Sequence, residues 1–128
     1  MRVLDTSFLI DLQREWTGNR EGGATRFLRA HAREGFAISS VTAVEFLEGY
    51  ESLSEGERFL EPYQWIEVNP NIARAASRIR RRLRQVNVPI GDFGIIIAAT
   101  ALELEAPLVT ADIAHFQPIH ELVVDSYR

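Results

Sequence analysis

The feature that most limits the fold is a short strand followed directly by a helix, a step that recurs along the chain. Residues 2–5, RVLD, are predicted to form a buried strand, and TSFLIDL after them has helical spacing, with Phe8 and Leu9 on its apolar side. FAISS at 36–40 and then VTAVEFLEGY repeat the step, with Ser40 expected to cap the second helix. Strands that alternate with helices favour a parallel sheet covered on both faces.

The second half of the chain continues this alternation. We expect further strands at WIEV, PLVT and ELVVDSY, a long amphipathic helix in NIARAASRIRRRLRQVN, an apolar helix in GDFGIIIAATAL and a short turn or helix at ADIAHF. Neither a linker nor an internal repeat divides the 128 residues. The sequence therefore predicts one α/β domain over residues 1–128, with a short parallel sheet flanked by helices on both faces.

Composition excludes several classes of protein. The chain has no cysteine and no lysine, so disulfides, thiolate zinc sites, phosphate-binding P-loops and Schiff-base chemistry are excluded. A net charge of −4 means that any contact with nucleic acid must be local. The longest apolar run is far shorter than the roughly 18 residues that span a bilayer, and no secretion signal is apparent. We therefore expect a soluble, unexported protein of the cytoplasm, with no membrane contact.

Acidic residues come directly after the predicted strands. Asp5 ends the first strand, Glu45 lies about one turn into the second helix, Asp92 begins the apolar helix, and Asp112 follows PLVT. Because the carboxyl ends of parallel strands meet at one edge of a sheet, these four carboxylates are expected to converge. Close carboxylates repel unless a cation lies between them, and Mg²⁺ prefers oxygen ligands. Such ions can activate a water against a phosphodiester, so hydrolysis of a nucleic-acid backbone is the expected chemistry.

Each acid also has a simpler interpretation. Asp5, Asp92 and Asp112 could each only cap the helix that comes next, since aspartate is a common capping residue. Glu45 could be a solvated residue, as most helical glutamates are.

Two other polar features have simple interpretations as well. His115 could be a surface or hydrogen-bonded histidine rather than a metal ligand. The arginine-rich stretch at 78–84 is either a solvated helix face or a contact for phosphates.

Four segments in order carry a resemblance to a known family. DTSFLI, SSVTAVEFLEG, PIGDFGIIIAATAL and LVTADIAHF together resemble the PIN-domain ribonucleases, specifically the VapC toxins of toxin–antitoxin pairs. No single motif is specific, but four at compatible spacing over nearly the whole chain are. The resemblance implies a PIN-like domain over residues 1–128 and a carboxylate cluster that binds Mg²⁺ or Mn²⁺. It also implies an RNA substrate, a VapB-like antitoxin partner and a homodimer.

The resemblance assigns roles to five residues. Asp5 and Asp112 match metal-binding acids, and Glu45 matches an acid that binds metal or orients the attacking water. Ser7 and Thr110 match hydroxyl positions that flank the acids.

One family position has no acid in this chain. Similar sequences read GDFD before the IAAT helix, whereas this chain has Gly94 at the last of these positions. Asp92 is the nearest acid and a possible substitute ligand. Glycine in a helix costs up to about 1 kcal/mol against alanine, and the sequence offers no structural reason for it. Three explanations of the missing acid stay open: a natural loss of this ligand, an inactive paralogue, and a selected or deliberate substitution. We expect a descendant of an active ribonuclease that binds metal weakly and cleaves poorly.

The leading functional hypothesis is therefore a metal-dependent endoribonuclease toxin held in check by an antitoxin. The alternative is a catalytically inactive PIN-like module that binds antitoxin or RNA without cleavage, for which Gly94 is the main support. A phosphoacceptor receiver domain resembles this pattern of acids, but such domains have an essential lysine. A ribonuclease H-type fold fits DTS and IAAT less well.

Large apolar residues on the early helices are either core or a docking surface for an antitoxin helix. They are Leu12, Trp16, Phe46, Tyr50, Phe59 and Tyr63.

Overall fold

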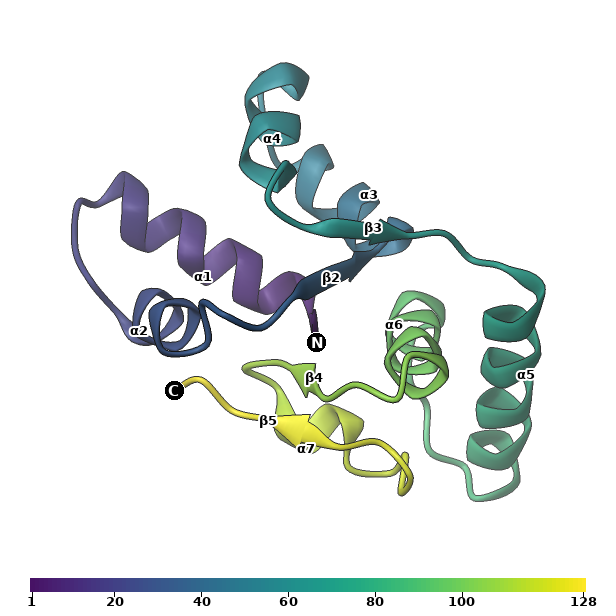
Figure 1. Ribbon diagram of the computed structural model, residues 1–128. Helices are drawn as coiled ribbons and strands as arrows, with labels where there is room; N and C mark the ends of the chain where they lie inside the picture. Colours follow the sequence, from purple (N-terminus) through teal and green to yellow (C-terminus); the bar gives the residue numbers. More distant parts are fainter.

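A five-stranded parallel sheet runs through the centre of the chain (Figure 1). The computed structural model describes all residues, 1–128. The strands are β1 (Arg2–Leu4), β2 (Phe36–Ser39), β3 (Gln64–Ile66), β4 (Leu108–Val109) and β5 (Val124–Asp125). Their order is β3-β2-β1-β4-β5, and each pairs with its neighbours in parallel. The predicted α/β class, with helices on both faces, is confirmed.

Seven helices cover the sheet. They are α1 (Thr6–Thr17), α2 (Gly23–Ala30), α3 (Ser40–Glu48), α4 (Leu53–Leu60), α5 (Pro70–Gln85), α6 (Asp92–Glu103) and α7 (Ile113–Phe116). In Figure 1, α5 lies alongside α6 on one side, while α1 to α4 occupy the other. None of the helices combines the length and apolar content needed to cross a membrane.

Alternate side chains of the central strands enter two different cores. Val3 and Leu108 pack with α5 and α6, whereas Leu4 and Val109 pack with the helices of the first half. This division follows from the two-residue repeat of a strand, which turns successive side chains to opposite faces. Short strands are therefore enough to contribute to both cores, because each of these four residues is fully buried.

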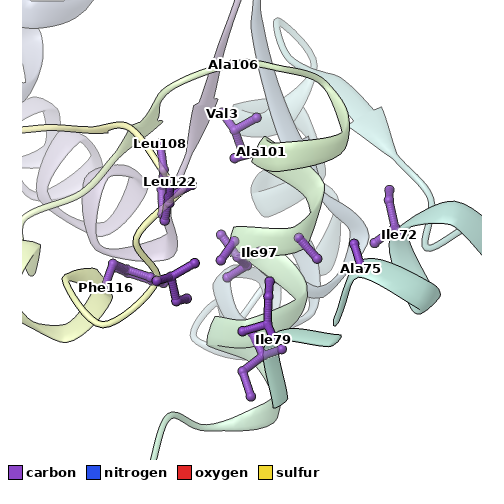
Figure 2. Close-up of a cluster of buried hydrophobic side chains, with 14 of the residues drawn as sticks. Val3, Ile72, Ala75, Ile79, Ile97, Ala101, Ala106, Leu108, Phe116 and Leu122 are labelled. Carbon is purple, nitrogen blue, oxygen red and sulfur yellow. The ribbon is translucent and has the colours of Figure 1, made fainter. Parts of the chain in front are cut away.

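Helix α6 is apolar on nearly every side because it lies between α5 and the sheet. Figure 2 shows Ile97 and Ala101 of α6 between Ile72 and Ile79 of α5 on one side and strand residues such as Leu108 on the other. A helix that is apolar all round is expected in such a buried position.

Two boundary predictions differ from the structure. Ser39, not Ser40, caps α3: its hydroxyl accepts a hydrogen bond from the Val41 amide at 3.2 Å. The Ser40 hydroxyl instead donates to the Ile66 carbonyl at 3.4 Å, which connects the start of α3 to the end of β3. The helix predicted over NIARAASRIRRRLRQVN ends at Gln85, before Val86, which is 61% exposed.

Candidate active site

The site lies where the direction of the sheet's connections reverses. From β1 the chain builds β2 and β3 on one side, and later β4 and β5 on the other. Ligands of open parallel sheets bind outside the carboxyl ends of the two strands at such a reversal, here β1 and β4. Asp5 follows β1 and Thr110 follows β4, and the Asp5 amide donates to the Val109 carbonyl at 2.9 Å.

The Asp5 carboxylate does not cap a helix. Asp5 precedes α1, yet its side chain makes no capping hydrogen bond. Its Oδ2 atom accepts hydrogen bonds from the hydroxyls of Ser7 at 3.0 Å and Thr110 at 2.7 Å. Asp5 is only 9% exposed. The capping alternative for Asp5 is wrong, and its Oδ1 atom has no hydrogen-bond partner in the protein.

The two hydroxyls beside Asp5 are themselves held by backbone amides. Ser7 Oγ accepts from the Ala111 amide at 3.1 Å, and Thr110 Oγ1 accepts from the Asp112 amide at 3.0 Å. Each hydroxyl therefore has its proton directed at Asp5 and its lone pair used elsewhere. The structure places both predicted hydroxyl residues, Ser7 and Thr110, against the first acid.

Glu45 reaches this region through a residue that the sequence analysis missed. Its Oε1 atom accepts a hydrogen bond from the Thr6 hydroxyl at 2.6 Å, and its side chain is half-buried. Thr6 follows Asp5 directly, so the bond links α3 to the start of α1 beside the first acid. The hydroxyl in the middle of the DTS motif was the available signal.

Asp112 is exposed and begins α7. Its Oδ1 atom accepts from the His115 amide at 3.3 Å, so the capping interpretation of Asp112 is confirmed. Its Oδ2 atom has no partner. Because the Asp112 amide bonds to Thr110, the residue is nevertheless next to the Asp5 cluster.

Asp92 is a predicted site residue whose carboxylate pairs with an arginine of α5. Gly91, not Asp92, caps α6, and the Asp92 carboxylate lies 3.2 Å from the Arg80 guanidinium of α5. Its side chain is 64% exposed. The predicted convergence of four carboxylates is therefore wrong, because no three of the acids come together and Asp92 pairs instead with Arg80 of the neighbouring helix.

Gly94 faces the imidazole of His115. A Cβ atom at Gly94 would lie 3.2 Å from His115 Nε2 and 3.2 Å from the Ile90 Cγ2 methyl. Such contacts require the neighbours to shift by a few tenths of an ångström. Gly94 is therefore closely packed against His115 and Ile90, a feature that the sequence alone did not show.

Comparison of the chain with known proteins identifies its family. The model of the PIN domain family matches residues 2–118. The chain belongs to the PIN domain family. This PIN domain is 30% identical over 124 residues to Ribonuclease VapC19 of Mycobacterium tuberculosis, covering 95% of this chain and 97% of that protein. It is 29% identical over 128 residues to Ribonuclease VapC1 of Methanocaldococcus jannaschii, covering 98% and 85%. The predicted recognition, a PIN domain of the VapC type, is confirmed.

Solved structures share the fold of this PIN domain. VapBC2 from Rickettsia felis, bound to a promoter DNA fragment, superposes with a TM-score of 0.84 at 21% identity, covering 99% of this chain and 98% of that one. DNA-bound VapBC from Salmonella typhimurium gives a TM-score of 0.85 at 19% identity, with all of both chains covered (100% each). At these identities the likeness shows the fold alone.

The acids of this PIN domain have the oxygen donors that a hard cation prefers. Neither arginine nor histidine forms an ion pair with Asp5, Glu45 or Asp112. No three acidic or histidine side chains come close enough to surround an ion. Mg²⁺ is commonly held by one or two carboxylates and several waters. The residues fit an ion bound in that open manner, not one enclosed by protein ligands.

Proposed function

We propose that this PIN domain is a metal-dependent endoribonuclease toxin that hydrolyses RNA phosphodiesters and is neutralised by a VapB-like antitoxin. The observation that carries the proposal is the Asp5 carboxylate, which is almost fully buried, unpaired with any cation and oriented by two hydroxyls at the reversal of the sheet. Burying an uncompensated charge is unfavourable, so such an arrangement suits a residue that binds a cation. The names of the relatives, Ribonuclease VapC19 and Ribonuclease VapC1, support the choice of RNA.

The proposed roles depend on which carboxylate oxygens are free. Asp5 and Asp112 each have one carboxylate oxygen without a protein partner and are the proposed ligands of Mg²⁺ or Mn²⁺. When bound, such an ion supplies an activated water and stabilises negative charge on the phosphate. Glu45, whose Oε1 is fixed by Thr6, either binds the ion through Oε2 or orients the attacking water.

An inactive module that binds antitoxin or RNA without cleavage is the second candidate. Two observations favour it: Asp92 is paired with Arg80, and Gly94 brings no carboxylate at all. Three acids therefore remain where the family resemblance implies a fuller set. Weak metal binding and slow cleavage are the expected consequence.

Calorimetric titration with Mn²⁺ tests the cation site directly. Asp5→Asn keeps an oxygen that Ser7 and Thr110 can bond to but removes the charge, so we expect metal binding to fall at least tenfold, which is about 1.4 kcal/mol. Asp92→Asn is the matched control, because it removes an acid that faces Arg80, and it should leave the affinity within about twofold. Equal binding by the parent protein and Asp5→Asn would reject a cation site at Asp5.

Cleavage of a labelled RNA then separates the two candidates. The endoribonuclease predicts Mn²⁺-dependent cleavage that EDTA and Asp5→Asn both abolish. Metal binding without any cleavage would favour the inactive module instead.

For the antitoxin, we propose a docking surface around the exposed Trp16, where α1 meets α4. Trp16 is 50% exposed and its ring lies 5.2 Å from that of Phe59, which stacks on Phe46 at 5.1 Å. Leu53 at the start of α4 is also exposed, at 59%. An amphipathic helix could cover these side chains. Leu12, Phe46 and Tyr63 are buried and belong to the core, so only part of the expected set is available. The homodimer stays a prediction from the resemblance.

A further inference from the structure

Helix α5 concentrates positive charge on an otherwise acidic protein. Six of the fourteen arginines lie within its 16 residues, and the helix has no aspartate or glutamate. The whole chain nevertheless has a net charge of −4. The six are Arg74, Arg78, Arg80, Arg81, Arg82 and Arg84. A long helix without a single acid is therefore a local basic surface rather than part of a mixed one.

Most of this charge is not neutralised within the protein. Arg80 pairs with Asp92 and Arg82 with Glu121, while the Arg74 guanidinium donates to the Asn71 side chain. The other three arginines, among them Arg84, form no ion pair and are exposed. Their guanidinium groups are thus available to an anion from outside.

Arg80 and Arg84 line a groove of about 390 Å³ at the junction of α5 and α6. They are four residues apart and so lie on the same side of the helix. Asn87 adds an amide, whereas Leu83, Ile90 and Ile95 form apolar walls, and no acidic residue lines the groove. A nucleotide has the complementary pair of properties, namely a phosphate for the guanidinium groups and a base or sugar for the apolar walls.

The groove adjoins the candidate active site. Ile90 lines the groove, and its Cγ2 methyl is one of the two groups nearest to a side chain built at Gly94. The other is the imidazole of His115, whose backbone amide bonds to Asp112. Ile90 and His115 therefore both lie against Gly94 in the first turn of α6, so this turn connects the basic groove to the Asp112 end of the site.

We propose that the groove between α5 and α6 binds a phosphate of single-stranded RNA next to the bond that is cut. The proposal rests on the proposed nuclease function. An acidic peptide could also pair with arginines, but the groove adjoins the acids proposed to act on a phosphodiester, which favours RNA. Because the protein as a whole repels polyanions, RNA needs such a local basic surface to bind.

Binding of RNA in EDTA tests this subsite without any cleavage. The probe is a fluorescein-labelled, single-stranded RNA of about 12 nucleotides, and its affinity is measured by fluorescence anisotropy between roughly 50 and 200 mM salt. We expect Arg84→Gln to weaken binding about tenfold across sequences and to reduce the salt slope by roughly 0.7, the value of one single-strand phosphate contact. Arg74→Gln, on the same helix but outside the groove, should change the affinity less than about twofold.

Three outcomes decide the matter, with circular dichroism used to confirm that each variant is folded. Equal affinity and salt slope for Arg84→Gln and the parent protein would overturn the proposal. So would an Arg84→Gln variant that loses binding of a polyglutamate peptide while it keeps that of RNA, since the groove would then be a peptide site. RNA binding that depends on Arg84 but never leads to Mn²⁺-dependent cleavage would support the groove and contradict the nuclease function.

Discussion

At the scale of single residues, the site uses neutral groups to hold a charge. Asp5 has hydroxyl partners and no arginine, in contrast to Asp92, which is paired with Arg80. Hydroxyls fix the orientation of a carboxylate but leave its charge uncompensated. This difference separates an acid that can bind a cation from one whose charge is already balanced.

Gly94→Asp should restore a carboxylate at the family position that has no acid in this chain. We expect tighter Mn²⁺ binding and faster RNA cleavage than in the parent protein, because the new carboxylate adds an oxygen ligand to the site. The gain should be modest, since the new Cβ atom displaces His115 or Ile90 slightly. Calorimetry and cleavage rates measure both effects.

Gly94→Ala is the matched control for this change, because it adds the same Cβ atom without the charge. If Gly94→Asp and Gly94→Ala cleave at the same rate as the parent protein, Gly94 does not occupy a vacated ligand position.

At the scale of elements, a buried carboxylate joins α1 to α2. Glu15 is 7% exposed and accepts hydrogen bonds from the amides of Gly22, Ala24 and Thr25 and from the Thr25 hydroxyl. A Cβ atom at Gly22 would lie 2.5 Å from this carboxylate, so a larger residue there would displace the carboxylate from its present position. The bonds supply the orphan amides at the start of α2 with an acceptor.

Glu15→Gln should lower the free energy of unfolding by about 2 kcal/mol near neutral pH. Burial raises the pKa of Glu15, but the hydrogen bonds from Thr25 and the neighbouring amides outweigh it and hold the pKa below its ordinary value of 4.5. The stabilisation is therefore complete above pH 4.5 and is lost as the pH falls through the lower, folded-state pKa. Urea unfolding at about pH 7 and about pH 3 should show the difference between parent and variant shrinking in acid.

Glu21→Gln provides the comparison for Glu15→Gln, because Glu21 is exposed and pairs only with Arg29 at the surface. It should change the stability by less than about 0.5 kcal/mol. A Glu15→Gln variant as stable as Glu21→Gln at both pH values would contradict the structural role.

The elements themselves were largely predictable from the sequence, because hydrophobic periodicity and strand-to-helix steps act locally. The start of α2 was less so: residues 15–23 are polar and rich in glycine, which is typical of a loop, yet α1 continues to Thr17 and the Glu15 carboxylate organises the first turn of α2. Within the site, the positions of Asp5 and Thr110 could be inferred from strand ends, while that of Ser7 was implied by the resemblance to the PIN-domain ribonucleases. The orientation of Asp92 could not, since it depends on Arg80 from a helix packed beside it.

At the scale of the whole molecule, residues near both ends of the chain meet on α1. The Tyr127 hydroxyl donates to Asp11 Oδ2 at 2.5 Å and to the Ser7 carbonyl at 3.2 Å, and Arg128 pairs with the same carboxylate. Burial raises the pKa of Tyr127, and the bond to Asp11 raises it further, so the phenol stays a donor at neutral pH. This contact steadies the helix that contributes Ser7.

Tyr127→Phe should lower the free energy of unfolding by about 1 to 2 kcal/mol, because Asp11 loses a hydrogen-bond donor. Thermal or urea unfolding measures the change. Tyr63→Phe is a suitable reference: Tyr63 is equally buried at 7% exposure, but its hydroxyl makes no hydrogen bond in the protein. Equal losses in the two variants would show that the Tyr127 bonds contribute nothing beyond packing.

The proposed docking surface for an antitoxin can be tested by substitution. If the aromatic residues between α1 and α4 form the docking site, Trp16→Ala should weaken the complex with a VapB-like antitoxin by about tenfold, as is typical of an interfacial tryptophan. Val44→Ala is the matched control, because Val44 is similarly exposed, at 53%, but lies outside the Trp16–Phe59 contact. Equal affinities, measured by calorimetry, would place the antitoxin elsewhere.

The reversal of the sheet between β1 and β4 divides the site between two lengths of chain. Asp5 and Glu45 come from the first, and Thr110 and Asp112 from the second. Neither fragment on its own contains a complete set of groups. A protein split in the segment between β3 and α5 would therefore assemble the proposed cation site only when its two halves reassociate.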